Sequence, residues 1–288
     1  MLRALALFLT ALPLIAQYPP VLPEAQEETY KTVGETKLRL WIFGHDRQPA
    51  TPRAAIVFFF GGGWTGGTPG QFHQHAKLLA ANGMVAIVAD YRVATRHQVK
   101  VDSCVRDAKS ALRYVRANAK RLGIDPNRIA AGGGSAGGHL AAATASVPGF
   151  EEAGEDTAIS SRPNALVLFN PVLVLGPVPG VDLPKDSIRL DTPRFGVPPT
   201  EISPYHHLQK GGPPTIVFHG EADTTVPFVS AQLYRDKAVS LGIACELVGY
   251  PGQTHGFFNY GRANNQFYQK TTARMLEFLK KLGYLAGA

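Results

Sequence analysis

Gly133-Gly134-Ser135-Ala136-Gly137 is the stretch of this sequence that decides its fold. It fits the pattern G-x-S-x-G, and it stands between a short apolar run, Arg128–Gly132, and an Ala-rich segment, Gly138–Ser146. A strand that turns this sharply into a helix has no room for side chains two residues before and two residues after the serine. The pattern therefore predicts a strand, a tight turn and a helix, with the Ser135 hydroxyl held out at the carboxyl edge of a sheet.

The segments on both sides alternate between predicted strands and predicted helices. The strands are continuous apolar runs rich in β-branched and aromatic residues, and the helices are longer periodic segments with stop signals such as Gly83 and Gly123. The predicted strands are Leu38–Phe43, Ala54–Phe60, Met84–Ala89, Arg128–Gly132, Ala165–Phe169, Thr215–His219 and Cys245–Gly249. The predicted helices are Gln71–Asn82, Asp102–Leu122, Gly138–Ser146, Val229–Leu241 and Thr271–Leu282. This alternation predicts an α/β fold, with a mostly parallel central sheet and helices on both faces.

Two stretches interrupt the alternation. Pro148–Pro163 is acidic and polar, and Pro171–Pro214 is rich in proline with few periodic positions. We expect both to run above the sheet, the second as a small lid. With 288 residues, 45% of them hydrophobic, and no visible repeat, the chain is expected to form a single domain over residues 18–288.

The first 17 residues are typical of a secretory signal peptide. Arg3 precedes the apolar stretch Ala4–Ile15, and Ala16 follows it. A core helix is the alternative, because Leu14 is a poor match to the small residue preferred three positions before a cut after Ala16. The apolar stretch is shorter than the about 20 residues that a membrane span needs. We therefore expect a secreted or periplasmic protein without stable membrane insertion.

Charge and cysteine content exclude other classes of protein. The net charge of +7 is spread along the chain without a basic run, so we expect no binding of nucleic acid. Cys104 falls in a predicted helix and Cys245 in a distant predicted strand, so two buried free thiols are at least as reasonable as one disulfide. Two pairs of histidines have no evident third ligand, and we expect no metal: His73 with His75, and His206 with His207.

Two further residues stand where Ser135 needs partners. A serine hydroxyl is a weak nucleophile at neutral pH, so a base must lie within hydrogen-bond reach. His255 follows the last predicted strand and Asp223 follows the strand before it, which brings all three residues to one edge of a parallel sheet. We interpret Ser135 as nucleophile, His255 as general base and Asp223 as the acid that orients the base. Glu221, two residues from Asp223, is the alternative acid.

A glycine-rich loop, Phe60-Gly61-Gly62-Gly63-Trp64, follows another predicted strand. The main-chain N–H groups of Gly62, Gly63 and Ala136 are predicted to converge on the oxyanion of a tetrahedral intermediate. Trp64 beside this loop has two interpretations of equal weight, packing in the core and a stacking face for a sugar or an aromatic acyl group. It is our candidate for binding substrate.

These motifs give the chain a resemblance to the α/β-hydrolase superfamily, and within it to secreted esterases of the hormone-sensitive-lipase-like, feruloyl and acetylxylan esterase groups. The resemblance covers nearly all of Leu38–Leu282 and rests on Phe60–Trp64, Asp90-Tyr91-Arg92, Gly123–Pro126, Gly133–Leu140, Asp223 and His255-Gly256-Phe257. It implies an α/β-hydrolase fold with a small lid. The oxyanion loop of this family usually opens with histidine, and Phe60 stands there instead, so the hydrogen bonds that shape the loop must differ.

A dinucleotide site is the main competing interpretation of the glycine-rich loop. Gly61–Gly66 also fits G-x-G-x-x-G after a strand, and Asp90 ends the next strand. That fingerprint requires a helix to open on the motif, whereas Gly67-Thr68-Pro69-Gly70 prolongs a loop. It also leaves the serine, aspartate and histidine contexts unexplained, so we expect no organic cofactor.

The sequence therefore predicts a serine carboxylesterase that works through an acyl-enzyme. The resemblance favours short acyl or feruloyl esters, on a small ester or an acylated carbohydrate. A small amidase or formamidase and a serine peptidase of the same fold are alternatives, and a non-catalytic protein that uses the pocket as a receptor is another. The sequence leaves the oligomeric state open.

Overall fold

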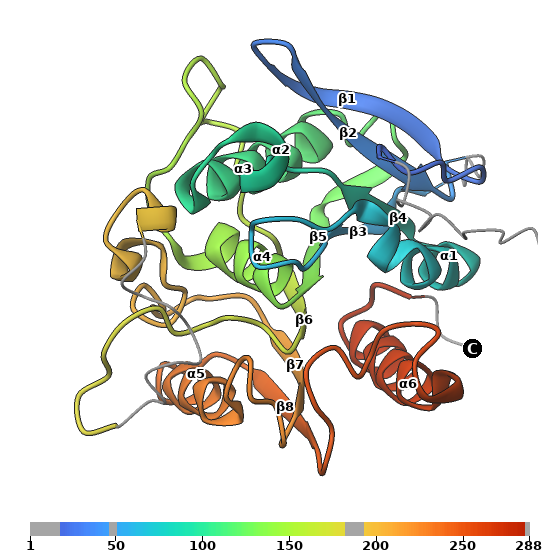
Figure 1. Ribbon diagram of the computed structural model, residues 1–288. Helices are drawn as coiled ribbons and strands as arrows, with labels where there is room; N and C mark the ends of the chain where they lie inside the picture. The colour runs from blue at the N-terminus through green and yellow to red at the C-terminus, as the bar shows by residue number, and fades with distance from the viewer. Residues whose placement is uncertain (1–17, 46–50, 182–192, 286–288) are drawn as a thin grey trace, which may run out of the picture.

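The computed structural model describes residues 18–45, 51–181 and 193–285, and it is built around one eight-stranded sheet (Figure 1). The strands are β1 (Gln26–Val33), β2 (Thr36–Phe43), β3 (Arg53–Phe59), β4 (Val85–Ala89), β5 (Ile124–Gly134), β6 (Ala165–Phe169), β7 (Thr215–Gly220) and β8 (Cys245–Tyr250). They lie side by side in the order β1-β2-β4-β3-β5-β6-β7-β8. Strands β3 to β8 run parallel, and the hairpin of β1 and β2 adds an antiparallel edge.

Helices cover both faces of the sheet (Figure 1). The α-helices are α1 (His73–Ala81), α2 (Ala94–His97), α3 (Val101–Ala117), α4 (Ala136–Ser146), α5 (Phe228–Ser240) and α6 (Gln266–Lys281). The 3-10 helices are η1 (Pro69–Phe72), η2 (Pro193–Phe195), η3 (Pro199–Ile202) and η4 (Ala263–Asn265). Helices α1 and α6 pack on one face, and α3, α4 and α5 pack on the other. This arrangement confirms the predicted α/β fold class.

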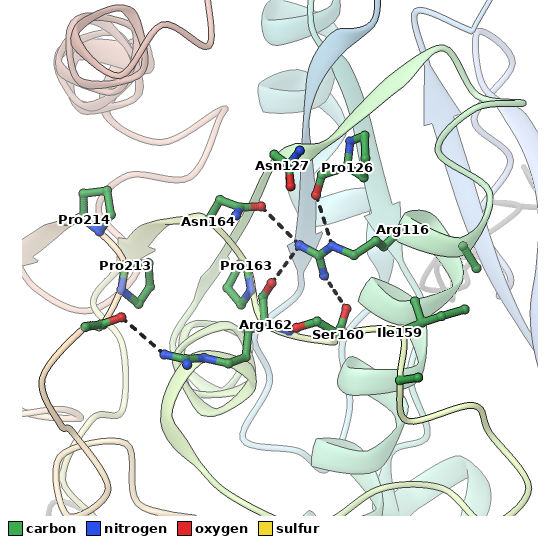
Figure 2. A pocket seen from close by; sticks show the side chains of 14 residues that line it. Arg116, Pro126, Asn127, Ile159, Ser160, Arg162, Pro163, Asn164, Pro213 and Pro214 are labelled. Atoms are coloured by element: carbon green, nitrogen blue, oxygen red, sulfur yellow. Dashed lines mark hydrogen bonds between the residues drawn. The ribbon is translucent and has the colours of Figure 1, made fainter.

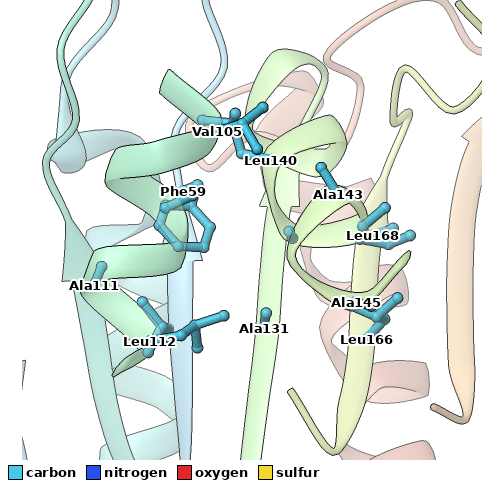
Figure 3. Packing of buried hydrophobic residues seen from close by; sticks show 14 of the residues in the cluster. Phe59, Val105, Ala111, Leu112, Ala131, Leu140, Ala143, Ala145, Leu166 and Leu168 are labelled. Atoms are coloured by element: carbon cyan, nitrogen blue, oxygen red, sulfur yellow. The ribbon is translucent and has the colours of Figure 1, made fainter. Parts of the chain in front are cut away.

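Alternate residues of each central strand supply two separate hydrophobic cores. In β6, Leu166 and Leu168 belong to the core under α3 and α4, whereas Val167 and Phe169 belong to the core under α1 and α6. Figure 3 shows the first core, where Phe59 of β3 and the two leucines of β6 meet side chains of α3 and α4. Burial of each such leucine or phenylalanine contributes about 1.5–3 kcal/mol to the free energy of folding. Because both faces of the sheet are packed in this way, the sheet holds the loops at its edge in fixed positions.

The structure confirms the seven predicted strands, with ends that move by a few residues, and adds one. Strand β1 was not predicted because its apolar alternation breaks at a register shift between Thr29 and Lys31, which leaves the neighbouring Tyr30 and Lys31 both buried. Helix α3 ends at Ala117 rather than at the predicted Leu122. The expected signal peptide, residues 1–17, lies outside the described residues.

Of the two interrupting stretches, the acidic one lies mainly at the surface, whereas the described part of the second one buries residues such as Leu173, Leu175 and Ile202 in the core under α3 and α4. The acidic stretch docks along α3, where Lys109 and Arg113 pair with Glu151, and Arg113 also pairs with Glu155. The described part of Pro171–Pro214 contains only short helices and turns. Cys104 lies in α3 and Cys245 in β8, and both thiols are free. No helix within the described ranges has the length and apolar character needed to cross a membrane.

Candidate active site

Ser135 occupies a strained turn between β5 and α4. Its φ of 54° and ψ of −119° lie in a region that residues with a side chain rarely adopt, which costs on the order of 1–3 kcal/mol. A Cβ atom on Gly133 would lie 2.4 Å from the carbonyl oxygen of Gly137, and one on Gly137 would lie 2.0 Å from that of Phe59. Only glycine fits at both positions, as the sequence pattern predicts. The Ser135 N–H group donates to the carbonyl of Phe169 at 2.9 Å, which holds the turn against β6.

The structure brings Ser135, His255 and Asp223 into one chain of hydrogen bonds. The Ser135 hydroxyl donates to Nε2 of His255 at 2.9 Å, and Nδ1 of His255 donates to Oδ2 of Asp223 at 2.7 Å. Each residue follows a different strand: Ser135 follows β5, Asp223 follows β7 and His255 follows β8. The sheet thus brings together a serine and a histidine that are 120 positions apart in the sequence. The side chain of Glu221, the alternative acid, approaches the backbone at Gly249 instead.

Asp223 is held as a carboxylate by the donors around it. Burial opposes its ionisation, but hydrogen bonds from His219, His255 and the N–H group of Val226 outweigh burial and hold the pKa of this carboxyl well below its usual range. Its Oδ1 accepts the N–H groups of Thr225 and Val226 at 2.9 Å each. An ionised carboxylate fixed in this way keeps the Nδ1 proton of His255 in place and leaves Nε2 free to accept a proton.

Two residues that the sequence analysis did not select support this arrangement. His219, the last but one residue of β7, lies with Nε2 at 3.5 Å from Oδ2 of Asp223 and 2.8 Å from the carbonyl of Val226. Asn170, after β6, accepts the N–H group of Gly256 at 3.0 Å through Oδ1 and so holds the loop that carries His255. The position of His219, four residues before Asp223 at the end of a strand, was a signal for its role. Asn170 had none.

The predicted oxyanion donors lie beside the nucleophile. A Cβ atom on Gly61 would lie 3.3 Å from Cβ of Ser135, so the glycine-rich loop touches the turn that carries the serine. Among the described residues, none accepts the N–H groups of Gly62, Gly63 or Ala136. Ala136 is the first residue of α4, where main-chain N–H groups have no partner within the helix. Three donors are therefore available at this edge of the sheet.

Trp64 is buried, with 3% of its surface exposed. Its indole N–H group donates to Nδ1 of His139 at 3.3 Å, and its ring packs edge-on against His139 and Phe195. The guanidinium group of Arg194 lies over the ring, 5.2 Å from its centre. Burial lowers the pKa of His139 to about 4, so its neutral ring accepts this bond and its Nε2 donates to Ile202. These contacts favour packing in the core, and binding of substrate by Trp64 stays a prediction.

The two histidine pairs, His73 with His75 and His206 with His207, lie in different surroundings. His206 bonds Ser203 and the carbonyl of Pro177, and His207 bonds the carbonyl of Thr200. His75 is enclosed by aromatic rings, and His73 packs on Phe43. Within the described ranges, no group of three or more His, Cys, Asp or Glu side chains has the geometry to hold a metal ion.

A surface pocket of about 870 Å³ lies at the opposite end of the sheet, near the amino ends of β6 and β7 (Figure 2). Arg116, at the end of α3, donates there to the carbonyls of Pro126, Ser160 and Arg162 and to the side chain of Asn164. None of the three residues of the hydrogen-bonded chain lines this pocket. The guanidinium group of Arg116 in this pocket is thus bonded to the protein itself, and the candidate catalytic residues lie at the carboxyl ends of the strands.

Known esterases are among the proteins that this chain resembles. Residues 44–169 match the BD-FAE family, and residues 198–283 match the prolyl oligopeptidase family. Esterase LipC of Mycobacterium tuberculosis is 30% identical over 73% of this chain and 54% of its own length. Carboxylesterase NlhH of the same organism is 27% identical over 84% of this chain and 78% of its own length. The chain thus spans about half the length of LipC.

Solved structures give a fuller match. The structure of Thermogutta terrifontis esterase 2 phosphonylated by sarin is 50% identical over 94% of this chain and 100% of its own, with a TM-score of 0.91. The butyrate-bound structure of that esterase is 50% identical over 95% of this chain and 99% of its own, with a TM-score of 0.89. The fold and the site define a serine hydrolase of the α/β type. The chain belongs to the esterases of the α/β-hydrolase superfamily.

Proposed function

We propose that this chain is a serine carboxylesterase that hydrolyses short-chain acyl or feruloyl esters, on small or carbohydrate alcohols, through an acyl-enzyme. The observation that carries the proposal is the chain of hydrogen bonds from Ser135 through His255 to Asp223, beside three main-chain donors that bond no acceptor among the described residues. This is the arrangement that activates a weak nucleophile and stabilises the oxyanion it generates.

The proposed reaction uses these groups in sequence. Nε2 of His255 takes the hydroxyl proton as Oγ of Ser135 attacks the ester carbonyl, and the main-chain N–H groups of Gly62, Gly63 and Ala136 bind the oxyanion. The imidazolium then gives its proton to the leaving alcohol, and Ser135 remains acylated. Water activated by His255 repeats the steps in the second half and releases the acid. Asp223 stays ionised throughout and stabilises the imidazolium.

The preference for short acyl groups has two supports. The related esterase of Thermogutta terrifontis has been solved with propionate and with butyrate bound, both short carboxylates. In addition, the helices in the described part of the expected lid are short: η2 has three residues and η3 has four. Export through a signal peptide over residues 1–17 is a further part of this proposal. It is supported by the apolar stretch after Arg3, and N-terminal sequencing of exported protein tests it.

A series of p-nitrophenyl esters tests the proposal. We expect turnover to be fastest with acetate or butyrate and to fall for long chains, and the Ser135→Ala variant to lose roughly 10⁴-fold or more in kcat. Absent turnover, or turnover unchanged in Ser135→Ala, would contradict the enzyme hypothesis and favour a binding protein. Acetylated xylan and methyl ferulate then separate the two acyl classes. Faster cleavage of a matching p-nitroanilide than of the ester would identify an amidase or peptidase.

A further inference from the structure

The glycine-rich loop is shaped here by side chains other than the histidine usual in the family. Phe60 stands at that position, and its ring stacks on Tyr91 with 4.1 Å between ring centres. The hydroxyl of Tyr91 donates to the carbonyl of Phe60 at 2.7 Å. On the other side of the same peptide unit, the N–H group of Gly61 donates to Oε1 of Gln71 at 2.6 Å.

Two hydrogen bonds on opposite sides of one peptide unit fix its orientation. The peptide unit is planar, so anchoring both the carbonyl oxygen and the N–H group leaves it no free rotation. From this unit the chain runs through Gly61 into Gly62 and Gly63, which have φ angles of 125° and 60°. The carbonyl of Gly62 accepts the N–H groups of Thr65 and Gly66 at 3.0 and 3.1 Å, which holds the far end of the loop. Tyr91 and Gln71 therefore fix the near end of the loop, at the Phe60–Gly61 peptide, from which the chain continues to the oxyanion donors.

Gln71 also reaches the loop that carries the base. Its Nε2 donates to Oδ1 of Asn259 at 2.9 Å, and Nδ2 of Asn259 donates to the carbonyl of Gly256 at 2.9 Å. Gly256 directly follows His255. Because the Gly61 N–H group requires an acceptor, the amide of Gln71 has one orientation, and that orientation presents a donor to Asn259.

We propose that Gln71 is a positioning residue that holds the oxyanion donors in register with His255. This inference rests on the proposed esterase mechanism and goes beyond it, because Gln71 is assigned no contact with substrate. Gln71 lies in η1, where it is partly buried. It connects the loop after β3 with the loop after β8, and 188 positions of sequence separate it from Asn259. A displacement of about 1 Å in such a constellation reduces the rate about 10²-fold.

The Gln71→Met variant tests the proposal, since methionine has a similar length and can neither accept the Gly61 N–H group nor donate to Asn259. We expect kcat for p-nitrophenyl butyrate to fall about 10- to 100-fold with KM within threefold of the wild type. The inhibition constant of a trifluoromethyl ketone, which forms a tetrahedral adduct with an active serine, should weaken by a similar factor. Gln74→Met, in α1, is the matched control, because among the described residues its side chain has no hydrogen-bond partner, and it should keep wild-type kcat.

A double-mutant cycle with Tyr91→Phe separates positioning from general stability. If Tyr91 and Gln71 clamp the same peptide, their losses in kcat will be strongly non-additive, whereas separate structural effects would multiply. Asn259→Ala breaks only the connection to the His255 loop and provides a second variant if Gln71→Met does not fold. Unchanged kcat in Gln71→Met or, should that variant not fold, in Asn259→Ala overturns the inference. A fall in kcat with undiminished affinity for the ketone also overturns it. An inactive wild type would instead refute the esterase proposal.

Discussion

The two ends of the central sheet hold polar groups in opposite states. At the amino ends of β6 and β7, Arg116 donates to four oxygen atoms of its own chain (Figure 2). At the carboxyl ends, the described residues provide no acceptor for the N–H groups of Gly62, Gly63 and Ala136. The first arrangement orders the protein, and the second keeps hydrogen-bonding capacity for a reacting molecule.

The catalytic candidates at the carboxyl ends are held in place by the protein itself. Ser135 keeps an unfavourable φ because tight glycine contacts and a bond to β6 enforce it. His255 is oriented by Asp223, and its loop is held by Asn170. Groups that will bind a transition state must be fixed from behind, because the substrate supplies no energy to arrange them before it reacts. The comparison predicts that changes at the carboxyl end reduce catalysis, whereas changes at the amino end reduce stability.

The largest effect is expected from Asp223→Asn. An amide in this place no longer stabilises the imidazolium, and it favours the wrong tautomer of His255, so kcat should fall about 10⁴-fold. Steady-state hydrolysis of p-nitrophenyl acetate measures this loss, and Glu221→Gln is the matched control with wild-type kcat expected. A wild-type rate in Asp223→Asn, or a comparable loss in Glu221→Gln, would show that the acid of the triad has been misassigned.

The same carboxylate predicts a dependence of stability on pH. Because the pKa of Asp223 is lower in the folded protein than in the unfolded chain, ionised Asp223 stabilises the fold above the unfolded value of about 4. That contribution begins to decline as the pH falls below the unfolded value, and it is gone only below the folded pKa. Urea unfolding between pH 3 and 7 should therefore show a shallower acid decline for Asp223→Asn than for the wild type. Parallel curves would mean that the carboxylate does not gain its stabilisation on folding.

The sequence was enough to predict that Ser135, Asp223 and His255 lie together, because each of them stands in a recognisable local context, while their catalytic roles stay predictions. A strand, a glycine turn and a helix surround Ser135 within a few residues, and strand ends precede Asp223 and His255. Nothing local marks the pairing of Gln71 with Asn259, since 188 residues separate them and the bond exists only after the sheet has formed.

Two other features were beyond local patterns for different reasons. Strand β1 has an irregular alternation, because Lys31 is buried against Asp107 rather than exposed, with 2.7 Å between Nζ and Oδ1. Trp64 had two interpretations of equal weight, because a sequence cannot say whether a ring beside a loop faces the pocket or packs under it. The direction of a side chain at a turn depends on the backbone angles. Trp64 has a positive φ of 60°, and the neighbouring residues in the sequence do not predict this angle.

At the amino end, Arg116→Met should reduce stability without changing catalysis. The variant removes the donor for three carbonyls and an amide oxygen, partly exposed to water, and the free energy of unfolding should fall by about 1–3 kcal/mol. Urea denaturation measures the loss, while kcat/KM should stay within twofold. Arg235→Met, which breaks only an exposed ion pair with Asp236, is the control and should cost less than about 0.5 kcal/mol. A fall in kcat/KM in Arg116→Met would contradict the claim that the amino ends of the strands affect stability but not catalysis.

His75 provides a third case for the comparison of the two ends of the sheet. Among the described residues its ring has no hydrogen-bond partner, as the oxyanion donors have none, but the ring is fully buried and cannot reach a substrate. Both ring nitrogens lack a hydrogen-bond partner among the described residues, and Phe72, Phe169 and Tyr268 surround the ring. Burial lowers its pKa to about 3, so the neutral form is favoured in the fold, and stability present above pH 6.5 is lost as the pH falls toward that value.

His75→Leu should remove this proton linkage, which amounts to roughly 1.4 kcal/mol for each pH unit between 6.5 and the folded pKa. We expect the decline in the free energy of unfolding from pH 6.5 to 4.5 to become shallower in the variant, while the linkage of His139 remains. At pH 7 the exchange should change stability by about 1 kcal/mol at most, since leucine loses ring contacts but leaves no unpaired nitrogen. Equal slopes in wild type and variant would mean that His75 has a partner, such as a buried water, that keeps its charged form accessible. His75 would then no longer be an example of a buried polar group that lacks a hydrogen-bond partner.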